Sequence, residues 1–338
     1  MKYFVTGGSG FVGRYLLLKL LADGHVVHAL ARSDASAQAV EALGATPVRA
    51  DLLDVGSVVD AIEGSGVVVH AAADTRPWGR PGDFERVNVD GTRAVLAAAR
   101  AAGVKRFVHV STEAVLADGG PLRHVDETAP YPRKHAGEYP RTKAIAEQLV
   151  LAANGQDMRT VAVRPRMVWG PGDTTVLPPI LDAARQGRWA WIGGGDYLTS
   201  TCHVLNVCEG IECAAERGKG GQTYFLTDGA PVSFRDFITR QAAAHGVEMP
   251  DRSIPYALAK TAAVAVDRGW RVLHLKGEPP VSEVALALGG HEVTVDDLLA
   301  RQELRYAPVI GVEEGLADLE AEAARERDQE REQDQEQA

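Results

Sequence analysis

Short apolar runs alternate with amphipathic stretches of helical spacing over roughly the first 175 residues of the chain. The strand-like runs lie at residues 2–6, 26–31, 47–52, 67–73, 106–110 and 159–163. Strands that alternate with helices in this way favour a parallel sheet with helices on both faces. The pattern therefore predicts a doubly wound α/β fold.

The regular alternation ends at the Pro–Gly-rich segment 170–173. The elements predicted beyond it are a helix over 176–186, a strand around Trp189 and Trp191, strands near 200–207 and 222–227, and a helix over 234–245. We expect residues 1–175 to form a dinucleotide-binding domain that the strands near 200–207 and 222–227 rejoin. Residues 176–310 would then form most of a smaller α+β substrate domain.

A glycine-rich turn follows the first strand directly. Its glycines at 7, 10 and 13 permit a tight turn, close approach of the backbone to a pyrophosphate, and tight packing of the helix over 11–23. A lone glycine cluster is often only a turn, but here strand, glycines, helix and second strand follow in the order that a Rossmann fingerprint requires. The expected cofactor contacts are Gly7, Ser9, Gly10, Phe11, Val12 and Gly13.

The end of the second strand indicates which dinucleotide is bound. An NAD site usually carries an acid here for the ribose 2′-hydroxyl, whereas this chain has Ala31 followed by Arg32. A missing acid and an arriving arginine favour NADP over NAD, although Arg32 could instead be a solvated surface arginine. Further expected cofactor contacts are Asp51 and Leu52 near the adenine, and the small residues Ala71 and Ala72.

The predicted chemistry centres on Tyr139 and Lys143. Their spacing of four places both on one face of a helix that runs to about Ala153. An ammonium beside a phenol favours the phenolate, so we expect the pKa of Tyr139 to fall from about 10 toward working pH. The pair could then exchange a proton with a carbonyl or alcohol oxygen while another group moves a hydride. Alone, this spacing is usually a solvated helix face.

A hydroxyl pair, Ser111 and Thr112, follows the fifth strand at the carboxyl edge of the sheet, where α/β sheets place their chemistry. Such a pair is ordinarily a turn or a cap. Here it precedes Tyr139 by about one crossover, which suits a hydroxyl that shares the substrate oxygen with the tyrosine. His70, within the fourth strand, is expected to be a packed residue rather than a catalyst.

Composition and charge narrow the class of protein. The net charge is −10, but residues 313–338 hold 11 acids and 3 arginines (−8), which leaves about −2 for the body and argues against a nucleic-acid partner. The charged tail is predicted to be disordered. Three cysteines without metal spacing indicate reduced thiols in a cytoplasmic protein with no metal site. No uncharged run approaches the roughly 20 residues of a membrane helix, and no room is left for a signal peptide.

The segment 255–275 is predicted to form an amphipathic helix. Its simplest interpretation is a packing helix of the smaller domain. A substrate lid or a helix that lies on a membrane surface are the alternatives.

Three motifs together resemble the extended short-chain dehydrogenase/reductase superfamily over about residues 1–310: TGGSGFVG after the first strand, Ser111-Thr112-x-x-Val115, and Tyr139-x-x-x-Lys143. The segments RPRMVWGPGD (164–173) and EPPVS (278–282) are most similar to the 3β-hydroxysteroid dehydrogenase branch. That branch includes sterol-carboxylate dehydrogenases and bacterial reductases of long-chain 2-alkyl-3-ketoacids. The resemblance implies an NAD(P)-dependent oxidoreductase that interconverts a secondary alcohol and a ketone on a bulky apolar 3-hydroxy or 3-keto substrate.

The resemblance also implies roles for individual residues. Tyr139 is the acid/base, Lys143 orients the nicotinamide ribose, Thr112 is the second hydroxyl with Ser111 assisting, and Asn88 helps to hold the sheet edge and the cofactor. A homodimer through the helices at 93–102 and 143–153 is the family-level expectation. The remaining expected contacts are Pro165 and Val168 for the cofactor, and Trp78, Arg166, Trp169 and Trp191 for the substrate.

Two features leave alternatives open. Arg166 could pair with a substrate carboxylate or be a structural arginine, and Asn206 stands where many relatives carry Asp. A sugar-nucleotide epimerase or dehydratase on the same fold would need basic residues for a diphosphate, and residues 176–206 offer only Arg185 and Arg188. A catalytically idle NADP sensor would not need the hydroxyls of Thr112 and Tyr139.

Overall fold

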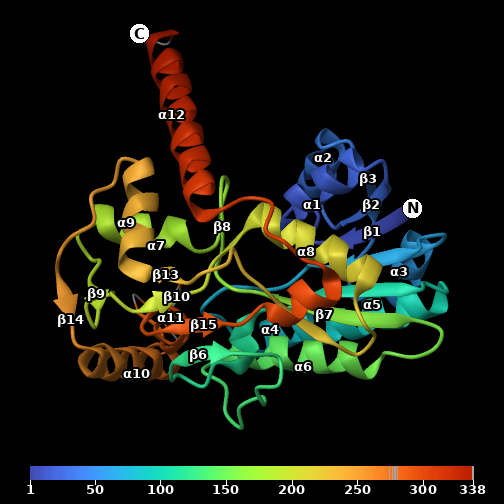
Figure 1. Cartoon of the computed structure of the whole chain (residues 1–338), viewed down its shortest axis with the longest axis horizontal. Helices are drawn as coiled ribbons and strands as arrows, with labels where there is room; N and C mark the ends of the chain where they lie inside the picture. The colour runs from blue at the N-terminus through green and yellow to red at the C-terminus, as the bar shows by residue number, and fades with distance from the viewer. Residues whose placement is uncertain (274, 276, 278, 280, 337–338) are drawn as a thin grey trace.

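A seven-stranded sheet, parallel throughout, forms the centre of the larger part of the protein, on the right in Figure 1. The structure is a computed structural model that describes residues 1–273, 275, 277, 279 and 281–336. The predicted α/β fold with a Rossmann-type sheet is confirmed. In spatial order the strands are β3 (Thr46–Arg49), β2 (Val26–Ala31), β1 (Lys2–Thr6), β4 (Val67–His70), β5 (Arg106–Val110), β7 (Arg159–Pro165) and β12 (Thr223–Leu226).

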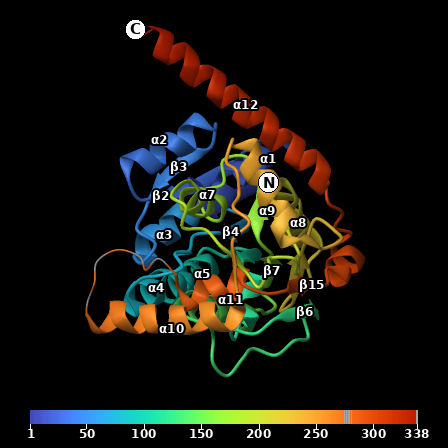
Figure 2. The ribbon, with the colours of Figure 1, turned by 90° about the vertical axis from the view of Figure 1, so that its left-hand side faces the viewer.

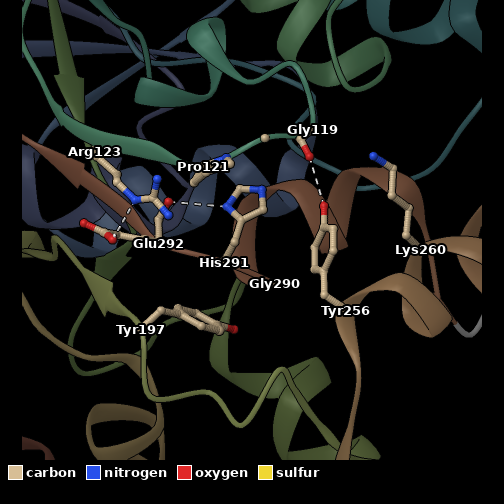
Figure 3. A pocket seen from close by; sticks show the side chains of 10 residues that line it. Gly119, Pro121, Arg123, Tyr197, Tyr256, Lys260, Gly290, His291 and Glu292 are labelled. Carbon is tan, nitrogen blue, oxygen red and sulfur yellow. Dashed lines mark hydrogen bonds and ion pairs between the residues drawn. The ribbon is translucent and has the colours of Figure 1, made fainter.

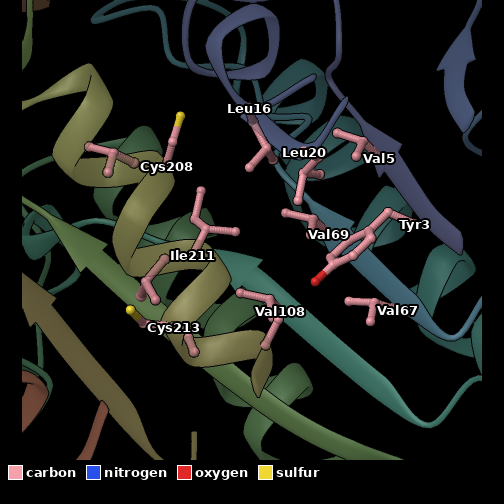
Figure 4. Packing of buried hydrophobic residues seen from close by; sticks show 14 of the residues in the cluster. Tyr3, Val5, Leu16, Leu20, Val67, Val69, Val108, Cys208, Ile211 and Cys213 are labelled. Carbon is pink, nitrogen blue, oxygen red and sulfur yellow. The ribbon is translucent and has the colours of Figure 1, made fainter. Parts of the chain in front are cut away.

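Alternate residues of the central strands supply two cores, one on each face of the sheet. On β1, Tyr3 and Val5 pack under α1 (Phe11–Ala22) and α8 (Val204–Arg217), as Figure 4 shows. Phe4, between them, points to the other face and packs under α3 (Val55–Ile62), α5 (Gly91–Ala101) and α6 (Glu138–Ala152). This is the alternation that a strand buried on both faces requires.

Two strands end earlier than the apolar runs predicted. β3 stops at Arg49, and the Asp51 carboxylate then accepts a hydrogen bond from the Leu53 amide in a local turn (3.0 Å). β4 stops at His70, because the Ala72 amide turns to donate to the Thr6 hydroxyl (3.2 Å). Small residues after β4 therefore lie across the end of β1 rather than extend the sheet.

The strand predicted near 200–207 is wrong beyond His203. Only β11 (Cys202–His203) is extended, and it pairs with β8 (Val168–Trp169) outside the main sheet. α8 begins at the next residue, and the His203 ring accepts from the Leu205 amide as its cap (3.3 Å). The apolar residues after 203 recur at helical spacing and belong to α8, not to a strand. The strand predicted near 222–227 is confirmed as β12.

The smaller domain combines short strands with four further helices. Its four-stranded sheet has the order β13 (Val232–Ser233), β10 (Leu198–Thr199), β15 (Val293–Val295) and β6 (Leu122–Val125), and β9 (Trp191–Ile192) pairs with β14 (Ser253–Ile254). The helices are α7 (Leu177–Arg185), α9 (Phe234–Ala244), α10 (Tyr256–Val272) and α11 (Glu283–Gly289). β6 comes from the first half of the chain, so the two halves interleave. The predicted domain boundaries stay a prediction.

The predicted helix over 255–275 corresponds to α10, which packs through Ala259, Ala263 and Asp267. Residue 274 of that prediction, and Glu278 and Pro280 of the EPPVS motif, lie outside the described residues. In the described part of the chain, no helix combines the length and the apolar character that crossing a membrane requires.

The prediction of a disordered tail from residue 313 is wrong for its first part. α12 (Val312–Glu336) begins there, and Leu316, Leu319 and Ala323 are buried. Their spacing of three and four places them on one helix face, which the high charge of the segment obscured. Figures 1 and 2 show the helix continuing away from the rest of the chain.

Asp228, just after β12, joins the sheet to the smaller domain. Its carboxylate accepts from the Trp169 indole (2.7 Å), the Thr201 hydroxyl (2.8 Å), the His203 amide (2.6 Å) and the Asn206 side chain (2.7 Å). Asn206, fully buried, also donates to the Ile310 carbonyl (2.8 Å). An aspartate at 206 would have no N–H group to donate to Asp228, which explains the amide at this position.

We predict that Asn206→Asp destabilises the protein by about 3–5 kcal/mol at neutral pH, because it sets a buried carboxylate against the half-buried Asp228 carboxylate. Asn206→Ala removes the same two donated hydrogen bonds without adding a charge, and also the oxygen that accepts from the Val309 and Ile310 amides, and is the uncharged control. The deficit of the Asp variant relative to the Ala variant should shrink as the pH falls and one carboxyl binds a proton. Urea unfolding at pH 5 and pH 8 measures this, and wild-type stability of Asn206→Asp at pH 8 would refute it.

Candidate active site

The glycine turn after β1 has the shape of a dinucleotide cradle. Gly7 has a positive φ of 77°, and a Cβ there would lie 2.8 Å from the Ala72 nitrogen. A Cβ on Gly13 would lie 2.0 Å from the Gly7 carbonyl oxygen, so α1 can approach the strand only without a side chain. No side chain caps α1 at Gly10, and Ser9 and Gly10 are exposed. The first-turn N–H groups are thus left for a phosphate, and the residues fit the predicted group.

The other predicted cofactor residues surround this turn. Arg32 is exposed directly after buried Ala31, and within the described residues no ion pair engages it; Asp34, two residues on, pairs with Arg49. Leu52 packs against Gly91. Asp51 is exposed, Ala71 and Ala72 lie against Gly7, Pro165 ends β7, and Val168 lies in β8.

Asn88 ties the loop after β4 to α6. Its side-chain oxygen accepts from the Asp74 amide (2.7 Å), and its nitrogen donates to the Asp74 carbonyl (3.1 Å) and the Thr142 hydroxyl (3.0 Å). His70, the last residue of β4 before that loop, hydrogen-bonds to the hydroxyls of Thr6 (2.7 Å) and Thr92 (2.9 Å). Burial lowers its pKa to about 3, so it stays neutral in a packed position.

Lys143 lies under the sheet edge, only 3% exposed, one turn after Tyr139. Its Nζ donates to the Val110 carbonyl (2.7 Å) and lies 3.4 Å from His109 Nε2. Burial lowers the pKa of Lys143 to about 8, partly opposed by Glu147 one turn further along α6. Lys143 is therefore a desolvated amine anchored at the end of β5.

The expected fall in the pKa of Tyr139 is not found. Burial, and then the Glu113 carboxylate, raise the pKa of Tyr139 above its ordinary value of 10, and a hydrogen bond with Thr112 opposes them only in part. Lys143 points to the Val110 carbonyl instead of the phenol. The tyrosine is consequently a protonated hydrogen-bond donor in this structure.

The pairing of two buried side chains beside the hydroxyls, Glu113 and Arg166, was not predicted. Thr112 donates to Glu113 Oε2 (2.8 Å), and Arg166 Nη1 donates to Glu113 Oε1 (2.8 Å). Arg166 Nη2 also donates to the Leu288 carbonyl (2.7 Å) and to Thr199 (3.2 Å). The sequence features that could have indicated this pair are the acid directly after Thr112 and Arg166 just after the strand that ends at Pro165, each among apolar residues. Ser111 is buried, and its hydroxyl has no partner in the described part of the chain.

The tryptophans predicted for the substrate occupy different surroundings. Trp169 and Trp191 are almost fully buried in the smaller domain and donate to Asp228 (2.7 Å) and the Pro250 carbonyl (2.8 Å). Trp78 is half-buried, with the Arg271 guanidinium 4.9 Å from its ring centre. Burial favours a packing role for the first two, and their contact with substrate stays a prediction.

A cavity of about 420 Å³ lies between α10, the loop before β6 and the start of β15 (Figure 3). The hydroxyls of Tyr256 and Tyr197 are bound to the carbonyls of Gly119 (2.9 Å) and Gly289 (2.5 Å), which leaves their rings as walls. Arg166 donates to the carbonyl of Leu288 (2.7 Å), the residue before Gly289, so the Tyr197 wall of this cavity lies near the Glu113–Arg166 pair. The other lining residues are Gly119, Gly120, Pro121, Arg123, Lys260, Gly290 and Glu292.

Comparison with known proteins gives the family of the chain. Residues 4–256 match the 3-beta hydroxysteroid dehydrogenase/isomerase family. The chain belongs to this family. It is accordingly an NAD(P)-dependent dehydrogenase or reductase, and the predicted resemblance to the 3β-hydroxysteroid dehydrogenase branch is confirmed.

Two reductases are among the relatives that match nearly the whole chain. The 4-hydroxy-2-methyl-3-oxo-4-farnesyl-3,4-dihydroquinoline-1-oxide ketoreductase of Stigmatella aurantiaca is 50% identical over 316 residues, 94% of this chain and 95% of its own. The 2-alkyl-3-oxoalkanoate reductase of Stenotrophomonas maltophilia is 34% identical, over 96% of this chain and 100% of its own.

Solved structures share the fold. The crystal structure of gox2253 is 29% identical with a TM-score of 0.73 and covers 95% of this chain and 98% of its own. The UDP-glucuronic acid 4-epimerase from Bacillus cereus in complex with NAD has a TM-score of 0.74 over 96% of this chain and 99% of its own at 18% identity, which shows the fold alone.

We predict that Lys143→Met changes the pH dependence of stability. Because the pKa of Lys143 is about 8 when folded and 10.5 ordinarily, the unfolded chain binds more protons than the folded protein between those pH values. The wild type therefore gains stability from this group as the pH rises from 8 to 10.5, and carries the cost of a buried charge below pH 8.

The advantage of Lys143→Met over the wild type should consequently fall by about 3 kcal/mol between pH 7 and pH 10.5. Denaturant unfolding at both pH values measures it, with Lys105→Met, at an exposed lysine, as a control for the loss of one positive charge. A stability difference that stays constant with pH would show that Lys143 is not buried as a charge.

Proposed function

We propose that this protein interconverts a ketone and a secondary alcohol on a bulky apolar 3-keto or 3-hydroxy substrate, with Tyr139 as the acid/base. The observation that carries the proposal is the meeting of the Thr112 and Tyr139 hydroxyls at the end of β5, beside buried Lys143 and near an aromatic-walled cavity. The reduced nicotinamide supplies the hydride when it is bound.

In reduction, Tyr139 donates its proton to the ketone oxygen. Its raised pKa keeps it in the donating form throughout the physiological pH range. Thr112 holds the same oxygen once its single hydroxyl proton has turned from Glu113 to the ketone. Lys143 lies where it can orient the nicotinamide ribose and attract the developing negative charge on Tyr139. Asn88 supports both by fixing α6 through Thr142.

The substrate class follows from the cavity and from the relatives. Tyrosine rings and glycine-rich backbone form most of the cavity wall, which suits an apolar ligand with few polar contacts. Each buried methylene contributes about 0.8 kcal/mol, so an isoprenoid, alkyl or sterol-like body could supply most of the affinity. Both reported relatives are named as reductases of substrates with an oxo group and a farnesyl or alkyl substituent.

The rival function, epimerisation or dehydration of a sugar nucleotide, has less support. It needs free cations for a diphosphate, but Arg123 at the cavity pairs with Glu292 (3.1 Å). Arg185 pairs with Asp182 (3.7 Å), and Arg188 donates to Gln186 (2.9 Å) at the exposed end of α7.

The test is turnover of a panel of hydrophobic 3-ketones and 3-hydroxy compounds against UDP-glucose and UDP-galactose. We expect cofactor oxidation with the ketones, and a fall of about 10²–10⁴ in kcat for Tyr139→Phe with cofactor binding retained. Near-normal turnover by Tyr139→Phe would remove Tyr139 from the mechanism. Epimerisation of a UDP-sugar without net cofactor oxidation would support the rival.

The preferred cofactor in this proposal is NADP(H). Arg32, exposed after Ala31, can meet a 2′-phosphate with a charge-assisted bond worth about 1.5–3 kcal/mol, or about tenfold to a hundredfold in kcat/KM. Arg32→Ala should lose most of the preference, whereas Arg188→Ala, at an exposed arginine on the smaller domain, should keep it. Equal or better kcat/KM with NADH in the wild type would contradict the assignment.

Assembly and location complete the proposal. We place the protein in the cytoplasm as a homodimer through α5 and α6. The free, buried state of Cys202, Cys208 and Cys213 supports a reducing compartment.

A further inference from the structure

A carboxylate of the protein itself lies next to the proposed catalytic hydroxyls. Glu113, 3% exposed, accepts the Thr112 hydroxyl hydrogen bond (2.8 Å), and its charge acts on Tyr139. A ketone oxygen bound by Tyr139 and by Thr112, with the Thr112 proton turned from Glu113 to the ketone, would therefore lie close to Glu113. A carboxylate on the carbon beside the ketone, as in a 3-oxo acid, would come to the same region.

The cation that could have received such a substrate carboxylate is already engaged. Arg166, 4% exposed, donates to Glu113 (2.8 Å), to the Leu288 carbonyl (2.7 Å) and to Thr199 (3.2 Å). Three of its five N–H groups are used in these bonds, and Nε is buried without a partner in the described part of the chain. Lys143, a further cation near the hydroxyls, is held by the Val110 carbonyl (2.7 Å) on the side where the cofactor ribose is expected.

We infer that Glu113 occupies the place of a substrate carboxylate on Arg166, and that the site consequently selects neutral ketones over 3-oxo acids. The inference rests on the proposed function, because it concerns the substrate of the same site. It makes Glu113 a specificity-determining and positioning residue, and it assigns Arg166 to Glu113 rather than to the substrate.

The selection has a simple electrostatic basis. A second carboxylate beside Glu113 would be a like charge in a water-poor site where Arg166 is already paired with Glu113. Specificity of this kind arises from a built-in repulsion as much as from attraction to the preferred ligand. The expected size is about tenfold to several-hundredfold in kcat/KM, as for a like charge placed across a binding interface.

A second buried pair provides the structural comparison. Arg164 binds Glu147 through two hydrogen bonds (2.9 and 2.6 Å), and both side chains are as buried as the Glu113–Arg166 pair. Within the described residues, Glu147 makes no hydrogen bond to Thr112 or Tyr139; its third hydrogen bond comes from the Tyr131 hydroxyl (2.5 Å). A purely structural role predicts the same consequences for loss of either glutamate.

The experiment uses the full chain, the free acid of a 2-alkyl-3-oxoalkanoate in fresh solution, and its methyl ester. The two substrates share one carbon skeleton and differ in the charge beside the ketone. The wild type should prefer the ester by at least about tenfold in kcat/KM. Glu113→Gln should abolish most of this preference, and Glu113→Ala, which frees Arg166, should favour the acid. Glu147→Gln, whatever it does to stability, should keep the wild-type ratio.

An acid-to-ester ratio near or above one in the wild type would overturn the inference while leaving the proposed function standing. An unchanged ratio in both folded Glu113 variants would also overturn it. If neither variant folds, the ratio in the wild type alone decides. Turnover of neither substrate, together with no turnover of any ketone in the panel, would sink the proposed function and this inference with it.

Discussion

The position of α6 against the sheet is the constraint on which the catalytic geometry depends. Arg164 reaches from β7 to bind Glu147 with two hydrogen bonds, and Tyr131 completes the acid's contacts. A buried ion pair adds little net stability, but it penalises every arrangement that separates its partners. Lys143 lies one turn before Glu147 on the same helix, and its anchorage at the Val110 carbonyl fixes the face that Tyr139 presents. Asn88 holds the turn between Tyr139 and Lys143 in place through its hydrogen bond to Thr142.

Near α6, ionisable side chains are buried at a cost in stability, which produces a site with little water. Lys143 holds a charge where its pKa falls to about 8, and Tyr139 is held protonated by burial and by Glu113. Groups of this kind cost stability in the folded protein and become useful only when a reacting oxygen and a cofactor complete their contacts. The strongly bound carboxylates of Glu147 and Asp228, away from the hydroxyls, supply the rigidity that the site needs.

Local patterns were sufficient for the fold and for the glycine turn. The glycine turn, β1, β2 and β5 follow from apolar runs and turn chemistry that act within a few residues. Errors arose where a distant partner decides the outcome. Residues 204–207 are helical because α8 packs on the main sheet, and α12 is ordered because Leu316 finds a core built from α9 and the segment around Trp169. The direction of the Lys143 ammonium, and the pairing of Glu113 with Arg166, depend on contacts across 33 and 53 residues, which spacing alone cannot reveal.

The central claim, that Tyr139 and Thr112 hold a ketone oxygen while a hydride reaches its carbon, is tested most directly by isotope transfer. A hydrophobic 3-ketone would be reduced with NADPH that carries deuterium at the reactive position of the nicotinamide, and the product analysed by mass spectrometry and NMR. The account predicts one deuterium per product molecule, bonded to the carbon that bears the new hydroxyl, and loss of this transfer in Tyr139→Phe. Product without the label at that carbon, or label that remains in the cofactor while the substrate is altered, would contradict it.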